Sequence, residues 1–499
     1  MHIFLTHHTT HRATSDISRI DWGVLAFLMT AWGTMVIMSI DLGLYSDDYW
    51  NLFEVHHRSN VDYFVHHLSN INSRYTYALV NKLMYHLFFD PDRLFAPLYV
   101  HAARIMVLTC HFSGIWLAYR ILSRIGVPKT ALLVLLPFIS FPLYADQALF
   151  WTAAAFAYPV GFVLMTSALY ALLQQRPRLF AVLAFFSLGA TEFVILPLLF
   201  GAAVYGYRRY RQLTSRRRLS ILKEGIIVLA PFVAWALIVG LTPAAASRDA
   251  RIHGHPKLFV APAAWAISFV TFYLRQLQPA AWMREHWYVA ATVVITVAAF
   301  LKKADERRIA FFLIAMYAAS MLPLSAVGYQ FRPVSHARLW YFPGFFFYVA
   351  AVSTLGFGIR QLFAKQHPFL QTTRVRRALT AGIAFFWLGI FVYFAIQTRS
   401  ITAQGEKTYA CARGFLDEIY FQANGRTPRR VQLCGMPKVF HNFSVFLSPN
   451  AGRFALGVIF DTDRAVPFSS KKECVDTWGR PWDQNICPAK VRYSVQYRR

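Results

Sequence analysis

Two adjacent carboxylates, Asp47 and Asp48, follow the first hydrophobic run of the chain, with Tyr45, Tyr49 and Trp50 beside them. Adjacent acids repel each other and raise one pKa, so one can act as a general base or both can hold a divalent cation. A solvated pair that caps a helix would explain them without any chemistry. Acids number only 24 in 499 residues, and aromatic neighbours are unusual in a solvated turn, so we favour a functional pair.

Cationic residues that can bind phosphate occur later in the chain, at Arg74, Arg332, His336 and Arg338. A guanidinium group suits planar, bidentate capture of phosphate oxygens. Arg74 heads an amphipathic run, where it could pair with an acid or a phosphate. Contact with lipid headgroups explains Arg74 equally well.

Glu192 is the only acid in the apolar run 179–206. A charge at bilayer depth costs about 2.5–3.5 kcal/mol on insertion scales, so this carboxylate needs a polar environment. We expect it to face an outer cavity. A buried ion pair that holds helices together is the alternative.

The histidine pairs His56-His57 and His66-His67 raise the question of a zinc site. Their spacing matches no ordinary zinc site, and an interfacial helix with polar histidines explains them as well. A metal site is therefore the weaker interpretation of these four residues.

The composition indicates that lipid is the main solvent of the protein that carries these residues. The chain is 56% hydrophobic and 15% charged, whereas a soluble protein carries roughly 25% charged residues. The net charge of +27 could suggest nucleic acid, but many basic residues lie in short clusters between apolar runs. That pattern is typical of cytoplasmic loops under the positive-inside rule, and we expect no nucleic-acid partner.

Hydrophobic runs of about 20 residues span a bilayer as helices. The sequence predicts such spans at 22–40, 95–119, 130–144, 153–173, 225–242, 286–301, 309–327, 338–358 and 378–397. Run 179–206 has basic clusters at both ends, so we expect two short helices that meet at residues 189–192. Segment 258–281 fits best in the outer interface. The total is about eleven spanning or partly spanning helices.

Placing the basic clusters in the cytoplasm fixes the topology. The N-terminus is then inside, residues 41–94 form a large first outer loop, and residues 398–499 lie outside. The chain thus divides into an all-α polytopic domain, 1–397, and a small α+β extracytoplasmic domain, 398–499. We expect a helix near 401–423 and strands at VQLC and FALGVIF in the second domain.

The tail holds four of the five cysteines, Cys411, Cys434, Cys474 and Cys487. An even number in a small exported domain suggests two disulfides, with three connectivities open. Four free thiols in a cytoplasmic tail are the alternative.

These features together resemble the GT-C superfamily of membrane glycosyltransferases, which includes protein mannosyltransferases, aminoarabinose transferases and bacterial O-antigen-modifying enzymes. The likeness rests on the acidic pair after the first span and on the long first outer loop with interfacial helices. Ser73-Arg74-Tyr75 is similar to a Gly/Ser-Arg-aromatic element of some bacterial members. The helix break at Thr191, the run 338–343 and an extracytoplasmic C-terminal domain also fit.

The resemblance implies a multi-pass enzyme of the inner (plasma) membrane that moves a sugar from polyprenyl phosphate to a glycan, lipid or protein acceptor. Asp47 or Asp48 would be the general base, with metal dependence left open. Cations such as Arg338, Arg332 or Arg74 would stabilise the leaving phosphate. The substrate and lipid-phosphate site would comprise Arg74, Tyr75, Glu192, Arg332, His336 and Arg338.

A transporter or flippase for a lipid-linked or anionic solute is the alternative function. It would share the spans, the interrupted helix and the acid at Glu192. The sequence shows no matching halves, and a folded tail is not needed for alternating access. A non-catalytic assembly or lipid-binding subunit is a third class.

Overall fold

The computed structural model describes the chain at residues 19–40, 42, 47–68, 74–89, 97–142, 146–150, 152–212, 218–241, 294–327, 341–364, 373–424, 428–434, 454–455, 458, 468–471 and 493–497. The predicted interfacial segment 258–281 lies outside these residues. Of the predicted span 286–301, residues 294–301 are described and 294–300 are helical.

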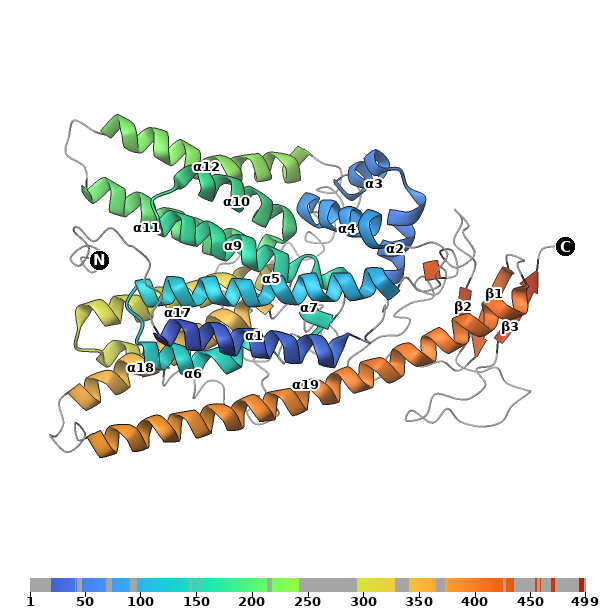
Figure 1. Cartoon of the computed structure of the whole chain (residues 1–499). Coiled ribbons are helices and arrows are strands. Elements are labelled where there is room, and N and C mark those ends of the chain that lie inside the picture. The colour runs from blue at the N-terminus through green and yellow to red at the C-terminus, as the bar shows by residue number, and fades with distance from the viewer. Residues whose placement is uncertain are drawn as a thin grey trace.

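Long helices pack side by side to form the body of the protein (Figure 1). They are α1 (Arg19–Ser39), α5 (Pro97–Arg124), α6 (Lys129–Ser140), α9 (Tyr158–Leu173), α10 (Pro177–Ala190), α11 (Ile195–Gln212), α12 (Arg218–Leu241), α17 (Ala304–Val327), α18 (Tyr341–Ala364) and α19 (Thr373–Ala423). Shorter helices lie near one end of this bundle: α2 (Asp47–His57), α3 (Asn60–His66), α4 (Tyr75–Phe88), α7 (Asp146–Phe150) and α8 (Thr152–Ala155).

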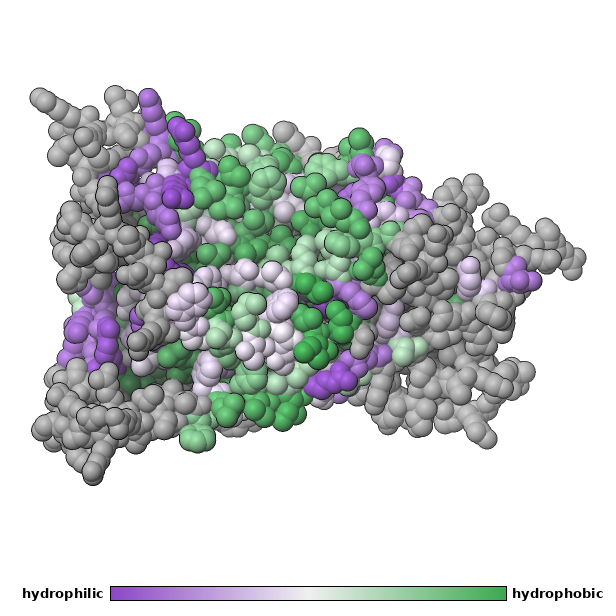
Figure 2. All heavy atoms as spheres, viewed as in Figure 1, coloured by the Kyte–Doolittle hydropathy of each residue, from purple (hydrophilic) through white to green (hydrophobic). Residues whose placement is uncertain are grey.

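The surface of the bundle is that of a helical membrane protein. Among the described residues, four helices are long and apolar enough to cross a bilayer: Asp21–Ser39, Leu98–Arg124, Tyr341–Gln361 and Phe385–Glu406. On α12, Ile226, Leu229, Val233 and Leu237 are all more than half exposed. Figure 2 shows hydrophobic residues over the middle of the bundle and hydrophilic residues toward its ends. The predicted helical membrane class agrees with this surface.

Helix α6 is shorter than the predicted span 130–144. Its 12 residues reach only about 18 Å, less than the ~30 Å hydrocarbon core. Pro137 lies inside it and cannot donate a hydrogen bond to the carbonyl of Leu133. The indole N–H of Trp387, on α19, donates to that oxygen instead at 2.6 Å. The predicted span 153–173 is likewise interrupted, since α8 ends at Ala155 and α9 begins at Tyr158.

Ion pairs join neighbouring helices at the end of the bundle where α11 ends and α12 begins. Arg209 donates from Nη2 and Nε to the two oxygens of Glu224 at 2.5 and 2.8 Å. Arg360 and Gln361 on α18 both donate to Glu306 on α17. These residues belong to or adjoin the basic clusters predicted to be cytoplasmic, and Figure 1 places the junction of α5 with α6 at the same end.

The C-terminal part of the chain begins with the single 51-residue helix α19, which runs through the predicted domain boundary at 397–398. Among the described residues that follow, the strands are β1 (Pro428–Cys434), β2 (Phe468–Lys471) and β3 (Tyr493–Tyr497). Strand β1 is central, parallel to β2 and antiparallel to β3. The predicted strand at VQLC is confirmed by β1.

The predicted strand at FALGVIF, residues 454–460, is wrong at the described positions, because Phe454, Ala455 and Val458 are helical. A short apolar run does not distinguish a strand from a buried helix by periodicity alone. The ring of Phe454 packs against Phe53 of α2, with centroids 5.0 Å apart, a tertiary contact that the local sequence does not reveal.

Candidate active site at the non-basic end of the bundle

Helix α2 begins at the predicted acidic pair. Asp47 is its first residue, and the Asp47 side chain lies outside the described residues. Asp48 is buried, with 3% of its surface exposed.

Helix α4 joins α2 and α3 to the bundle through buried polar contacts. Asn81 donates to the hydroxyl of Tyr63 on α3 at 2.7 Å and accepts from that of Tyr99 on α5 at 2.6 Å. Lys82 donates to the carbonyls of Val55 and Arg58, at 2.7 and 2.8 Å. It thereby caps the C-terminal end of α2, whose last carbonyls have no partner within the helix. These contacts fix the orientation of the helix that carries Asp48.

Arg74 forms a two-pronged ion pair with Glu192. Its Nη2 lies 2.8 and 2.9 Å from the two carboxylate oxygens, and its Nε lies 3.1 Å from Oε2. Burial alone would lower the pKa of Arg74, but the Glu192 carboxylate raises it above its ordinary value. Pairing with an acid, one of the predicted roles of Arg74, is therefore confirmed. For Glu192, the structure supports the alternative of an ion pair between helices.

Tyr75 and Thr76 dock the start of α4 onto the end of α10. Their hydroxyls donate to the carbonyls of Phe185 and Phe186 at 2.6 and 2.7 Å. The Tyr75 ring stacks on Phe185 and lies so close to Gly189 that a Cβ there would be 2.1 Å from the ring. Helix α10 ends one residue later, and the 3₁₀ turn Glu192–Val194 leads into α11. The predicted break in run 179–206 is confirmed at the predicted place.

Tyr77 connects the acid of α2 with the cation of α4. Its side chain is buried and its pKa is well above 10, raised first by burial and then by Tyr63, Tyr99 and Asp48, while Arg74 lowers it. Tyr77 thus interacts with the charges of both Asp48 and Arg74. The structure therefore brings three of the predicted site residues, Asp48, Arg74 and Glu192, into one cluster.

His67 lies in the same cluster and is fully buried, at 0% exposure. Its ring is enclosed by the aromatic rings of Tyr63, Tyr77 and Trp50, at centroid distances of 4.5, 5.6 and 6.2 Å. Within the described part of the chain, neither ring nitrogen has a hydrogen-bond partner. Burial is the main cause that lowers the pKa of His67 to about 3, helped by neighbouring positive charges. The imidazole is therefore neutral.

Two more buried polar residues lie near this end, and the sequence alone did not predict their roles. Arg104 on α5 donates to the carbonyls of Leu149 and Phe150 at 2.6 and 2.8 Å, capping the end of α7. The Nδ1 atom of His111 lies 2.6 Å from the hydroxyl of Tyr341, the first residue of α18. Both would be found in sequence only as ionisable residues inside the apolar run 97–124, which are costly unless partnered.

No protein-family model matches this chain. No curated protein matches it either.

The other predicted site residues are less fully placed. Arg332, His336 and Arg338 lie outside the described residues, as do Cys474 and Cys487. Cys411 is in α19 and Cys434 ends β1, and their side chains are not among those described. In the part of the chain that the structure describes, no three His, Cys, Asp or Glu side chains form a group that could hold a metal ion.

Proposed function

We propose that the protein is an integral-membrane glycosyltransferase that moves a sugar from a polyprenyl-phosphate donor to a cell-envelope acceptor. One observation carries the proposal: Asp48 on the helix of the acidic pair, Arg74 just before α4 and Glu192 at the helix break form one cluster at the end of the bundle near α2, α3 and α4. The proposal includes about eleven spanning or partly spanning helices, a cytoplasmic basic end, and an α+β tail with two disulfides on the extracytoplasmic side.

In the proposed reaction, an acceptor oxygen attacks the anomeric carbon of the donor sugar. The bond from that carbon to the phosphate oxygen breaks, and polyprenyl phosphate leaves as an anion. The acceptor proton passes to a carboxylate of α2, the general base. The leaving phosphate is already a good anion, so no general acid is needed, and nearby cations stabilise its charge.

We assign the base to Asp47 and a positioning role to Asp48. A base must come within hydrogen-bond reach of the acceptor, and Asp48 is buried at 3% exposure. Because Arg74 is engaged by Glu192, we assign the leaving phosphate to Arg338 and Arg332. Arg74, Tyr75 and Glu192 would then hold the site together.

A transporter is the second candidate, favoured by the interrupted helix at Glu192. The firm docking of α4 onto the break, through Arg74, Tyr75 and Thr76, argues against it, because alternating access requires such an element to move. Sugar transfer and solute uptake, measured on the same proteoliposomes, distinguish the two.

The test uses radiolabelled polyprenyl-phosphate sugar and envelope membranes from a deletion strain as acceptor. Asp47→Asn should slow transfer by about 10²–10⁴-fold, the usual contribution of a general base, with a smaller loss for Asp48→Asn. Asp62→Asn, an exposed acid of the same loop, is the matched control and should transfer normally. Full activity in both Asp47→Asn and Asp48→Asn would refute the mechanism, and loss of wild-type activity in EDTA would turn the pair into a cation site.

A further inference from the structure

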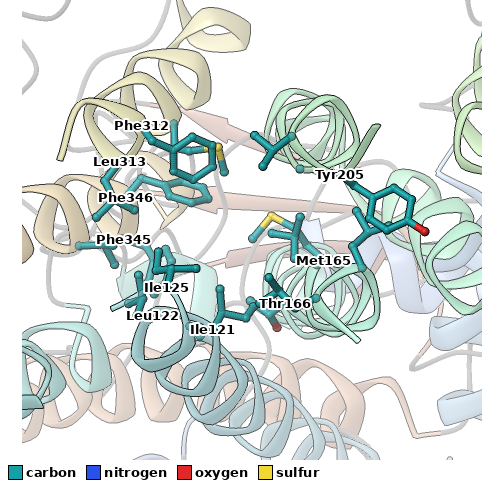
Figure 3. Close-up of a pocket in the computed structure, with 18 residues that line it drawn as sticks. Ile121, Leu122, Ile125, Met165, Thr166, Tyr205, Phe312, Leu313, Phe345 and Phe346 are labelled. Carbon is teal, nitrogen blue, oxygen red and sulfur yellow. The ribbon is translucent and has the colours of Figure 1, made fainter. Parts of the chain in front are cut away.

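An apolar cavity of about 120 Å³ lies among helices α5, α9, α11, α17 and α18. Figure 3 shows its walls, to which α5 contributes Ile121 and Leu122, α9 Met165, α17 Phe312 and α18 Phe345. The residues from α5 come from its last two turns, so the cavity lies in the half of the bundle nearest the basic end. The cluster of Asp48, Arg74 and Glu192 is at the other end.

The cavity presents hydrocarbon to any occupant, because its two most polar side chains are already engaged. The hydroxyl of Thr166 donates to carbonyls of its own helix, at 2.9 Å to Phe162 and 3.1 Å to Val163. The hydroxyl of Tyr205 donates to Glu224 at 3.0 Å, next to the Arg209–Glu224 pair. Apolar cavities of this size stay free of water and accept apolar groups instead.

The cavity wall is accessible from the lipid side. Ile121, Leu173, Gly201 and Phe312 are only half-buried, whereas the deeper wall residues Leu122 and Met165 are buried. At the edge of the cavity the side chain of Leu169 packs directly over Gly201, where a Cβ would lie 2.3 Å from it. A hydrocarbon chain in the bilayer can therefore enter sideways between helices.

A cation lies at the rim. Arg124 is exposed and sits on α5 between the wall residues Ile121 and Ile125. Its guanidinium lies over the ring of Tyr170 on α9, 4.7 Å from the centroid, which holds it above the seam between the two helices. A guanidinium beside an intramembrane cavity on the cytoplasmic side is suited to the phosphate of an anionic lipid.

We propose that this cavity is a binding site for an anionic glycerophospholipid, with the end of one acyl chain inside the cavity and the phosphate on Arg124. The volume suits a chain terminus rather than a whole lipid. The site lies at the opposite end of the bundle from the candidate active site. The proposal therefore does not depend on the proposed transfer reaction and holds equally for a transporter.

The probe is phosphatidylglycerol that carries a photoreactive diazirine at the end of one acyl chain, in vesicles with the purified full-length protein. We expect crosslinks to concentrate on Met165, Phe312 and Phe345. Unlabelled phosphatidylglycerol should compete better than phosphatidylcholine with the same chains. One basic residue near a membrane surface contributes about fivefold in affinity for an anionic lipid, so Arg124→Gln should weaken labelling about that much.

Matched variants separate binding from general lipid contact. Ala118→Leu places extra carbons in the wall and should abolish crosslinks in the cavity. Ala203→Leu, on an exposed position of α11, and Arg178→Gln, an exposed basic residue that does not line the cavity, should leave labelling unchanged. Labelling that is spread evenly over lipid-facing helices, or that Ala118→Leu leaves unchanged, would show that the cavity is a packing void that binds no lipid. Equal competition by phosphatidylcholine, or displacement by polyprenyl phosphate alone, would also overturn the assignment.

Discussion

His67 is the residue whose burial is hardest to explain by folding alone. Its ring has 0% exposure, and neither nitrogen meets a partner among the described residues. An unsatisfied buried polar group costs about 1–3 kcal/mol of stability. Such groups in native structures call for a functional explanation, and His67 lies beside Tyr77, which interacts with both Asp48 and Arg74.

Replacing His67 by Phe tests this explanation. The phenyl ring keeps the contacts with Tyr63, Tyr77 and Trp50 and removes the unpaired nitrogens, so the free energy of unfolding should rise by about 1–3 kcal/mol. Sugar transfer should fall. Thermal unfolding in detergent and the transfer assay provide the two measurements. A destabilised His67→Phe protein would mean that the imidazole has a structural partner.

The sequence could identify single functional residues only where a charged or polar side chain occurs in or next to an apolar segment. Arg74 and Glu192 could be singled out because charges near lipid are costly. Their pairing could not be predicted, because the two residues lie 118 positions apart in the sequence. The partners of Arg104 are the carbonyls at the end of α7. The sequence does not predict such a contact, because every residue type carries a backbone carbonyl.

The docking of α4 onto α10 depends on the absence of a side chain at Gly189. Gly189→Ala would place a methyl group 2.1 Å from the Tyr75 ring, and such overpacking costs roughly 1–3 kcal/mol. Tyr75→Ala should remove that penalty, so the double variant should lose less than the two single losses added. Gly206→Ala on α11 meets no atom within 4 Å and should be neutral or slightly stabilising. An equal effect at both glycines would contradict the docking.

The proline inside α6 gives a second prediction about a secondary-structure element. Trp387→Phe leaves the Leu133 carbonyl without its donor, at a cost of about 1–3 kcal/mol. Adding Pro137→Ala supplies a backbone N–H that can donate to the same oxygen, so the double variant should recover much of the loss. Thermal unfolding of the four proteins completes the cycle. Additive losses would show that the indole acts by packing alone.

Elements were predicted well where local chemistry decides them. The break in run 179–206 followed from basic clusters at both ends, and the amphipathic helix after Ser73 followed from its own periodicity. The donor to the Leu133 carbonyl inside α6 is a tryptophan 254 residues away. Residues 454–460 took helix at the described positions through a contact with α2. Long-range contacts override propensity, and a single sequence does not reveal them.

For the whole molecule, the basic clusters in the short loops between helices predict its orientation. On a background with all five cysteines replaced by serine, Asp62→Cys and Lys303→Cys add exposed thiols at opposite ends. A membrane-impermeant maleimide should label Asp62→Cys in intact cells, and Lys303→Cys only after the cells are opened. The reverse pattern would invert the topology and move the candidate site to the cytoplasm.

During synthesis of the chain, the ion pair between Arg74 and Glu192 can form only after Glu192 has been added. At about 5–20 residues per second, the ribosome takes some 6–24 s to add the 118 residues that separate the two partners. During that interval the nascent α4 lacks its docking surface on α10, while Leu79, Leu83 and Leu87 form an apolar stripe along it. The nascent α4 must therefore lie on the bilayer surface, with that stripe in the lipid, until the last turn of α10 has been synthesised.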